Sequence, residues 1–160
     1  MTILERKRIL IVDDEPDVLT TLEELLNMCH VEKAKDFDSG LELISKNKYD
    51  VVILDIQGVN GFELLKHSVA KGMPTIMLTA HVATPDALKE SIKLGANGFL
   101  PKEYMADIPE ILEELLEGKP QRMWWMESMK KTDKYFTKKY GSDWKEKDEF
   151  FQKFLDSLGK

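Results

Sequence analysis

The stretch VVILDIQGVNG, residues 51–61, places a single carboxylate, Asp55, directly after four apolar residues. An unbroken apolar run rich in Val and Ile is typical of a parallel strand that is covered on both faces. Gly58 and Gly61 predict a turn that leads into the next element. An acid at the end of a buried strand can be a nucleophile, a metal ligand, a phosphate acceptor or a turn former, and the rest of the sequence has to distinguish these roles.

The composition is typical of a globular protein. The 160 residues are 42% hydrophobic and 32% charged, which suits one ordinary domain with an appendage. Cys29 is the one cysteine, so no disulfide can form within the chain, and a reducing, cytoplasmic location is expected. The apolar runs are too short for a signal peptide or a membrane span, so no membrane contact is expected.

Charge is distributed unevenly along the chain. Residues 1–118 contain 12 Lys or Arg and 22 Asp or Glu, a balance of −10, whereas residues 119–160 contain 11 and 7, a balance of +4. The sign changes at Gly118, Lys119 and Pro120, a combination that also predicts the end of a helix. The chain is therefore expected to divide into a main domain, residues 1–118, and a C-terminal extension, residues 119–160.

Five short runs with strand character alternate with helical patterns. The strong runs are continuously apolar, as in parallel strands buried on both faces. Helical periodicity fills the intervals, so five β-α units and a parallel sheet wrapped by helices are predicted. The strand-like runs are RILIV at 8–12, the weaker VEKAK at 31–35, DVVIL at 50–54, PTIMLT at 74–79 and GFL at 98–100.

Capping residues and prolines predict where several helices begin. Thr84 and Pro85 supply a cap and a first-turn proline in the right order. Ser39 is a plausible cap for the second helix. Asp107 with Glu110 three residues later resembles a capping box for the fifth.

Polar residues follow four of the predicted strands at the point where each strand ends. These ends lie at one edge of a parallel sheet, where ligands and reacting groups collect. Each residue alone has an ordinary explanation, because aspartates cap helices and form turns, threonine favours strands and lysine is usually solvated. Capping does not require all of them at matching strand ends, so together they predict a functional site. The set consists of Asp13 and Asp14 after the first strand, Asp55 after the third, Thr79 ending the fourth and Lys102 after the fifth.

The chemistry of this set favours a magnesium-assisted reaction with a phosphoryl group. Three carboxylates held together raise one another's pKa unless a cation intervenes. Oxygen ligands suit Mg²⁺, which also binds phosphate oxygens, while Lys102 and Thr79 can bind others. Neither GxxxxGK[ST] nor GxGxxG occurs, so nucleotide hydrolysis and dinucleotide binding have no support.

Residues from about 6 to 118 resemble a receiver domain of the two-component response regulators. The segments that carry the resemblance are ILIVDDEP, VVILDIQGVNG, TIMLTA and GFLPKE, in the family's order. The resemblance covers most of the chain and is specific because four motifs match together. It implies a CheY-like, flavodoxin-like α/β fold, a doubly wound sheet of five parallel strands in the order 2-1-3-4-5.

The resemblance also implies a phosphorelay role. Asp55 would accept a phosphoryl group from a sensor histidine kinase or a phosphotransfer protein. Asp14 and Asp55 would bind Mg²⁺ together with the backbone carbonyl of Gln57, and Asp13 would act through water. The protein would assist its own phosphorylation and dephosphorylation without being a turnover enzyme.

Three further residues would respond to the phosphoryl group or tune it. Thr79 would turn toward the group, and Phe99 occupies the family's switch-aromatic position, although a core aromatic fits there equally. Together they would change contacts with an unidentified output protein. His81 lies where the family varies a residue near the attacking water, so we expect it either to modulate dephosphorylation or to be an exposed loop histidine.

The sequence departs from the family pattern at two positions. Gly58 and Val59 stand where a Met-Pro pair is common after the acceptor, which leaves the geometry of that loop open. Glu103 rather than proline follows Lys102, and a cis peptide before a non-proline residue costs about 2.5–4 kcal/mol, so a trans bond is the alternative there. Neither departure changes a phosphorylation residue.

Two other classes of protein can be tested on the same residues. Phosphatases of the haloacid dehalogenase type use an aspartate nucleophile in the pattern DxDx[TV], which DIQGV resembles except for Gln57. A neutral amide cannot transfer the proton that turnover requires, so hydrolysis of an external substrate is not expected. A receiver fold used as a phosphorylation-independent binding module is the other alternative, and the intact acid, hydroxyl and lysine set argues against it.

The C-terminal extension has helical composition, and we expect a helical hairpin. Ser142 can cap a second segment, which has an apolar face formed by Phe151, Phe154, Leu155 and Leu158. About 40 residues are few for an independent core, so the apolar residues from Met123 to Met129, including two tryptophans, should dock on a surface. Packing on the main domain and contact with a partner, such as a homodimer, are both open.

Lys130, Lys134 and Lys138 form a basic stripe in the extension. A transcriptional regulator whose extension contacts DNA is one alternative, but acids are interspersed and no helix-turn-helix pattern is evident, so nucleic acid is not the expected partner. A solvated face, or attraction to the acidic residues of the preceding helix, is the ordinary explanation.

Overall fold

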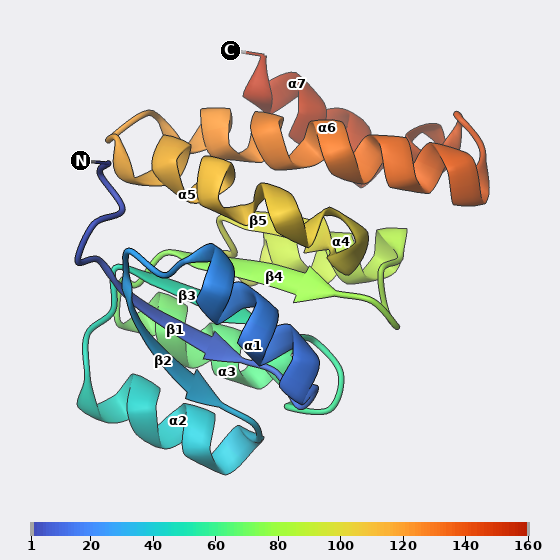
Figure 1. Cartoon of the computed structure of the whole chain (residues 1–160). Coiled ribbons are helices and arrows are strands. Elements are labelled where there is room, and N and C mark those ends of the chain that lie inside the picture. The colour runs from blue at the N-terminus through green and yellow to red at the C-terminus, as the bar shows by residue number, and fades with distance from the viewer. Residues whose placement is uncertain (1, 160) are drawn as a thin grey trace.

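A computed structural model describes residues 2–159 and contains one parallel sheet of five strands. The strand order is β2-β1-β3-β4-β5, which confirms the predicted order and the flavodoxin-like fold (Figure 1). All five strand-like runs form strands, including the weak one. The strands are β1 Arg8–Val12, β2 His30–Ala34, β3 Val51–Leu54, β4 Thr75–Thr79 and β5 Gly98–Pro101.

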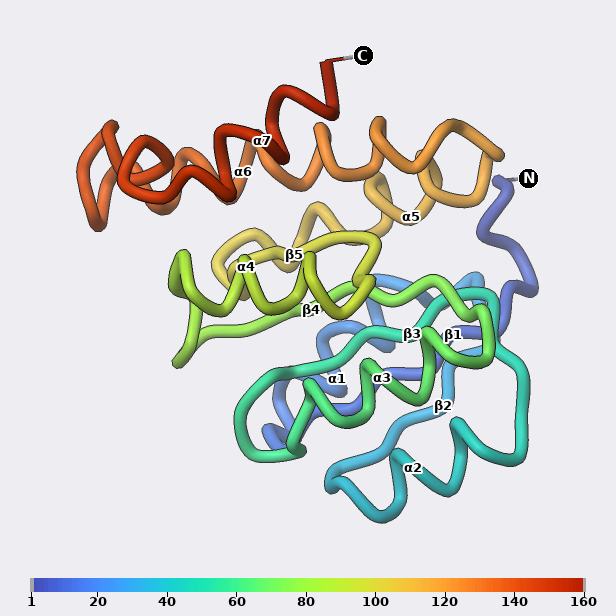
Figure 2. The backbone as a smooth tube through the Cα atoms, turned by 180° about the vertical axis from the view of Figure 1, so that it is seen from behind, coloured from blue at the N-terminus to red at the C-terminus, as the bar shows by residue number. Residues whose placement is uncertain are grey.

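Helices cover both faces of the sheet, as Figure 2 shows from behind. Side chains of β1 point alternately to the two faces, so Ile9 and Ile11 join one apolar cluster and Leu10 and Val12 the other. Helices α1 and α5 pack on the first face, and α2, α3 and α4 pack on the second. These helices are α1 Pro16–Leu25, α2 Phe37–Lys46, α3 Gly61–Ala70, α4 Pro85–Lys93 and α5 Ile108–Leu116.

The helix starts follow local hydrogen bonding, and two of the caps predicted in residues 1–118 are wrong. Thr84 caps α4 as predicted, because its side chain accepts a hydrogen bond from the backbone N–H of Ala87. The cap of α2 is Asp36 and not Ser39: the Asp36 carboxylate accepts the Ser39 N–H at 2.8 Å. Asp107 makes no capping bond, because the 3-10 helix η1, Lys102–Asp107, already leads into α5.

Two further helices follow α5. These are α6, Gln121–Tyr140, and α7, Glu149–Leu158, with the 3-10 helix η2, Trp144–Lys147, between them. The predicted cap Ser142 is wrong, since the Asp148 carboxylate accepts the N–H of Phe150 and begins α7. In Figure 1, α6 runs along the outer side of β5 and α7 lies against α6.

The C-terminal helices share a core with the sheet. Trp125, Met129 and Phe136 of α6 belong to the same apolar cluster as Leu10 and Val12 of β1. Of the two surfaces left open by the sequence, the extension therefore packs on the main domain. Although α6 has 20 residues, none of the helices in residues 2–159 combines the length and apolar character that a membrane span needs.

Candidate functional site

Four acidic side chains meet where β1 and β3 end. Asp13, Asp14, Glu15 and Asp55 each contribute one carboxylate oxygen to a group whose members all lie within 4.8 Å of one another. The strands force this meeting, because Val12 of β1 is paired with Leu54 of β3 and the residues that follow them are neighbours. Asp13 and Asp55 are buried, whereas Asp14 is exposed and Glu15 is half-buried.

Lys102 brings a positive charge into this acidic group. Its Nζ lies 2.9 Å from Asp13 Oδ2, 3.0 Å from Glu15 Oε1 and 3.2 Å from Asp55 Oδ2. The Lys102 side chain is only 9% exposed, and those of Asp13 and Asp55 are 2% and 3% exposed. Little water screens these contacts, so the ammonium interacts strongly with the carboxylates.

Burial and charge shift the pKa values of these groups in defined directions. Loss of solvation raises the pKa of Asp13 and Asp55 above the usual aspartate value, although Lys102 pulls both down. Burial alone would lower the pKa of Lys102, but its bonds to Asp13 and Glu15 and the charge of Asp55 raise it overall. The folded protein binds protons on these acids more tightly than free aspartate does, so their ionisation costs stability as the pH rises.

Backbone groups fix the two buried carboxylates. Asp13 Oδ1 accepts the N–H of Glu15 at 2.9 Å, and Asp55 Oδ1 accepts the N–H of Ile56 at 2.8 Å. One oxygen of Asp55 is therefore held by the chain, while Oδ2 faces Lys102. This orientation leaves Oδ2 as the oxygen that can attack an incoming electrophile.

The turn between β3 and α3 depends on two glycines. Gly58 has φ of +90°, and a Cβ there would collide with the carboxylate of Asp14. A Cβ on Gly61 would collide with the backbone carbonyl of Asp55. The loop that departs from the family pattern is thus shaped around the acidic group, and Val59 within it is fully buried.

Thr79 has a fully buried side chain whose Oγ1 has no hydrogen-bond partner among the described residues. A buried hydroxyl without a partner costs about 1–3 kcal/mol. Asp55 directly follows β3 and Thr79 is the last residue of β4, and because these strands are paired the two residues lie at the same sheet edge. An additional acceptor, such as a phosphoryl oxygen, would remove this cost.

Gln57 and His81 line a hollow of about 440 Å³ beside the acidic group, together with Asp14, Glu15 and Gly58. Gln57 is exposed in the turn after Asp55. The His81 side chain is 71% exposed, and its Nε2 lies 3.8 Å from Glu15 Oε1. Gln57, the expected backbone ligand, and His81, the expected modulating residue, therefore both border the entrance to the site, and Glu15 lies between His81 and Lys102.

Phe99, the expected switch aromatic, lies apart from the acidic group. It is fully buried, and its ring centroid is 6.2 Å from that of Phe136 in α6. Its backbone carbonyl accepts a hydrogen bond from Thr132 Oγ1 at 3.0 Å. Lys102 and Glu103 are joined by a trans peptide, and no cis peptide occurs in residues 2–159.

These residues fit a bound divalent cation. The donors are carboxylate oxygens, which Mg²⁺ prefers, and Gly58 leaves space against Asp14 that any side chain would fill. A carboxylate oxygen, an ammonium group and an unpaired hydroxyl at one strand edge can together accept a group that carries several anionic oxygens.

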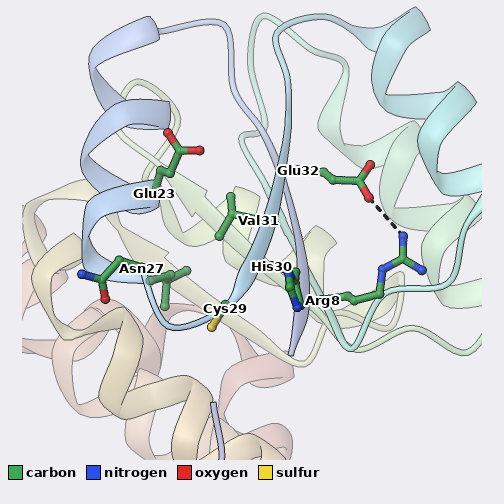
Figure 3. Close-up of a pocket in the computed structure, with 8 residues that line it drawn as sticks. Arg8, Glu23, Asn27, Cys29, His30, Val31 and Glu32 are labelled. Carbon is green, nitrogen blue, oxygen red and sulfur yellow. Dashed lines mark hydrogen bonds and ion pairs between the residues drawn. The ribbon is translucent and has the colours of Figure 1, made fainter. Parts of the chain in front are cut away.

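A second, larger hollow lies at the opposite end of the sheet (Figure 3). It has a volume of about 620 Å³ and lies beside the start of β2. Its charged side chains are paired, Arg8 with Glu32 at 3.0 Å and Glu23 with Lys33 at 2.9 Å. Burial raises the pKa of the Cys29 thiol, which favours its protonated, unreactive form. Of these two hollows, the one at the carboxyl ends of the strands is therefore the better candidate for a reactive site.

Comparison with known proteins assigns the class and then the family. The fold is that of a flavodoxin-like domain with an acidic site at the strand ends, and the family model "Response regulator receiver domain" matches residues 9–116. The chain belongs to the response regulator receiver family. A receiver domain from Methanospirillum hungatei superposes with a TM-score of 0.65 at 29% identity, covering 71% of this chain and 95% of that one.

The curated relatives are longer proteins. The two-component response regulator ARR18 of Arabidopsis thaliana is 39% identical over 101 residues, which is 59% of this chain and 16% of that protein. The transcriptional regulatory protein DltR of Streptococcus agalactiae is 36% identical over 106 residues, 62% of this chain and 47% of that protein. The chain thus spans less than half the length of these relatives.

The sequence predicted five strand-end residues of the site but did not predict a sixth residue that contacts one of them. The predicted set of Asp13, Asp14, Asp55, Thr79 and Lys102 does lie at one sheet edge. Glu15 was missed, although it directly follows the acid pair in DDEP. Glu15 belongs to the site because its carboxylate accepts a hydrogen bond from Lys102, which is 87 residues away in the sequence. No local sequence pattern predicts that contact.

Proposed function

We propose that Asp55 accepts a phosphoryl group from a sensor histidine kinase or a phosphotransfer protein. The observation that carries this proposal is the contact between Lys102 Nζ and Asp55 Oδ2, because it sets a cation beside the acceptor oxygen that the backbone does not hold. The unpaired hydroxyl of Thr79 supports the same role.

The transfer exchanges one bond to phosphorus for another. Asp55 Oδ2 attacks the phosphorus atom of a phosphohistidine, an O–P bond forms, the P–N bond breaks and the imidazole leaves with the electron pair and takes up a proton. Lys102 balances the negative charge that gathers on the phosphoryl oxygens, and Thr79 donates its hydroxyl hydrogen to one of them. The attacking group is the ionised Asp55 carboxylate, which needs no base; burial raises the pKa of Asp55, whereas Lys102 lowers that pKa and favours this charged form.

We assign the cation site to Asp13, Asp14, Asp55 and the backbone carbonyl of Gln57, with Asp13 acting through water. Bound Mg²⁺ would neutralise charge on the carboxylates and on the phosphoryl oxygens. The chain's own part is to hold these donors, which it does through Gly58 and through the N–H groups of Glu15 and Ile56.

In this proposal the phosphoryl group held on Asp55 is the signal. We assign no turnover of an external substrate to the site. Gln57 stands where a second acid would activate a hydrolytic water, and an amide cannot do this. His81, at the entrance, is the residue we assign to tuning the lifetime of the phosphorylated state. A His81→Ala variant should therefore change the dephosphorylation rate.

We place the output in contacts with another protein in the cytoplasm, controlled by Thr79 and Phe99. Lys130, Lys134 and Lys138 are all exposed, and Lys130 is paired with Glu127, as expected of a solvated face. A DNA-binding output remains the alternative, because DltR is a transcriptional regulatory protein. Loss of DNA binding on charge reversal of the three lysines would favour it.

The central test is covalent labelling. The full chain is incubated with a small phosphodonor such as acetyl phosphate and with Mg²⁺, and intact mass is recorded for wild type, Asp55→Asn and Asp38→Asn. We expect one phosphoryl group on wild type and on Asp38→Asn, whose aspartate is an exposed residue of α2, and none on Asp55→Asn.

Labelling that persists in Asp55→Asn would place the acceptor elsewhere. Absence of labelling in all three proteins, with an unchanged mass in the presence of Mg²⁺, would support a phosphorylation-independent binding module instead. Oligomer size measured alongside reports whether a homodimer forms with the phosphoryl group.

A further inference from the structure

We propose that the outer surface of the C-terminal helix pair, α6 with α7, binds an acidic amphipathic helix of a partner protein. The surface combines an apolar hollow between the two helices with the basic stripe of α6. It lies at the end of the molecule farthest from β2 (Figure 1), and none of the residues that line the hollow belongs to the acidic group at the strand ends. The inference goes beyond the proposed function, because it requires no phosphoryl group on Asp55.

The apolar hollow has a volume of about 310 Å³. Its apolar lining consists of Met126 and Met129 of α6 and of Leu155 and Leu158 of α7. Met129 and Leu158 are buried, whereas Met126 is 45% exposed. A hollow between two helices with such a lining accepts the apolar side chains of a third helix.

Two methionines leave apolar area in water at this surface. Met123 and Met126 are 40% and 45% exposed, and Ile3 at 36% is the other exposed large apolar side chain of residues 2–159. Residues three apart lie on the same face of a helix, so Met123 extends the apolar area of Met126. Methionine is flexible and polarisable, and it is common on surfaces that adapt to a bound helix.

The basic stripe continues from Met126 along α6. Lys130, Lys134 and Lys138 follow at intervals of four residues, which is about 6 Å along the helix axis. All three are exposed, and Lys134 and Lys138 have no ion pair within residues 2–159. Lys130 is 72% exposed and has a loose contact of 3.4 Å with Glu127. The stripe therefore presents positive charge to a ligand.

The acid that lines the hollow is already used within the chain. Asp133 Oδ1 accepts a hydrogen bond from Trp144 Nε1 at 2.8 Å, and Asp133 Oδ2 lies 3.1 Å from Lys145 Nζ. Asp133 therefore neutralises Lys145 and leaves the stripe uncompensated. The extension has a balance of +4 against −10 for residues 1–118, so this surface is where the chain complements carboxylates.

An acidic amphipathic helix matches both features at once. Its apolar residues at i, i+3 and i+4 enter the hollow, while carboxylates on its flanking turns meet lysines that repeat with the same helical rise. A second copy of this chain does not match, because a two-fold contact sets the same stripe against itself. DNA does not match either, because the methionines and the hollow offer no contact to phosphates.

The first test titrates the full chain into a fluorescently labelled peptide and records its anisotropy. The probe is a capped peptide of about 16 residues, with leucines at the helical spacing i, i+3, i+4, i+7 and with glutamate and alanine elsewhere. The control peptide has the same composition with its leucines out of that spacing. We expect the probe to bind with a dissociation constant below about 1 mM and more weakly at high salt, and the control peptide not to bind. Because the chain carries −6 overall, binding of an acidic peptide requires a local basic surface.

The second test locates the peptide with two pairs of variants. Met126→Glu should weaken binding about tenfold or more, as expected for an apolar anchor, whereas Ile3→Glu, the same change at another exposed apolar residue, should not. Reversal of Lys130 and Lys134 to Glu should weaken binding by about two- to fivefold for each lysine, the range for exposed ion pairs. Lys48→Glu is the control, an exposed lysine between α2 and β3.

The possible results are decisive for this surface. Binding of the probe that is lost in Met126→Glu and in the lysine variants, with both controls equal to wild type, supports the proposal. Absence of binding up to about 1 mM overturns it, and so does equal affinity of wild type and either folded site variant.

Other occupants give other results. A homodimer that dissociates in Met126→Glu, or duplex DNA that binds wild type but not the lysine variants, in the absence of peptide binding, would replace the acidic helix by that occupant and overturn the proposal. Phosphoryl labelling of Asp55 should be the same in Met126→Glu as in wild type. The proposed function therefore depends on labelling alone and this inference on peptide binding alone.

Discussion

Thr75 and Thr79 lie four residues apart in β4, both fully buried, and differ in what their hydroxyl groups bind. Thr75 Oγ1 donates to the Met73 carbonyl at 2.9 Å and lies 2.7 Å from Ser68 Oγ. Thr79 Oγ1 has no partner among the described residues. One threonine therefore stabilises the fold, and the other costs stability in a way that only a ligand can recover.

This contrast predicts opposite effects of the same substitution. Thr79→Val should raise the free energy of unfolding by about 1 kcal/mol, because it removes an unpaired buried hydroxyl. Thr75→Val should lower it by about 1–3 kcal/mol, because it removes a satisfied one and leaves a buried acceptor. Urea unfolding of both variants beside wild type measures the difference. A Thr79→Val protein destabilised as much as Thr75→Val would show that the Thr79 hydroxyl is bonded.

The residues of the site could be predicted where a strand end decides their position. Asp55, Thr79 and Lys102 follow apolar runs, and parallel strands bring such positions to one edge. Glu15 could not be predicted, because its position beside Lys102 is set by packing across the sheet and not by local sequence. The state of the Thr79 hydroxyl could not be predicted either, since it depends on what surrounds it in three dimensions.

At the scale of elements, the turn between β3 and α3 shows how backbone shape serves the acidic group. Gly58 and Gly72 both have positive φ, +90° and +74°. A Cβ on Gly58 would collide with Asp14, whereas a Cβ on Gly72 would meet nothing within 4 Å. Substitutions at both glycines introduce backbone strain, but only a substitution at Gly58 also interferes with the acidic group. Comparing the two therefore distinguishes these effects.

Gly58→Ala and Gly72→Ala should both lose about 1 kcal/mol of stability from strain at positive φ. Only Gly58→Ala should also weaken Mg²⁺ binding, because its methyl group pushes Asp14 out of the acidic group. The stabilisation that Mg²⁺ gives against thermal unfolding measures this, with Gly72→Ala as the control. Equal Mg²⁺ stabilisation of the two variants would mean that Asp14 is not a ligand.

The helix starts show where the local sequence is sufficient to predict the capping residue and where it is not. Thr84 followed by Pro85 was predicted correctly, because cap and proline act within one turn. For α2 and α7 several polar residues precede the helix, and the capping aspartates, Asp36 and Asp148, were missed. Which of these residues caps depends on where the packed face of the helix must begin, and that is a property of the whole fold.

At the scale of the whole molecule, the C-terminal helices and the sheet share one core. Phe136 is fully buried and connects Phe99 of β5 to Trp144 between the last two helices. All three tryptophans follow residue 118, so their fluorescence reports on the C-terminal part, while circular dichroism reports on every helix. A shared core predicts that the two signals change together.

We therefore expect coincident urea transitions by fluorescence and by circular dichroism for the unphosphorylated chain. Phe136→Ala should lower the free energy of unfolding by about 3–5 kcal/mol, the usual cost of emptying a buried aromatic site. Phe150→Ala, at a half-buried position in α7, should cost about 1–2 kcal/mol. A tryptophan transition at clearly lower urea than the circular dichroism transition would show that the helix pair is a separate unit.

The position of α6 along β5 has a consequence for how the molecule behaves in a crowded solution. A sheet ends in strands whose free N–H and C=O groups can recruit strands from other molecules, which is a route to aggregation. At one end, β2 is protected by charge, since Glu32 and Lys33 are held in ion pairs with Arg8 and Glu23. At the other end α6 lies over β5, and Thr132 already occupies the carbonyl of Phe99. The helix thus keeps a second polypeptide from adding a strand there.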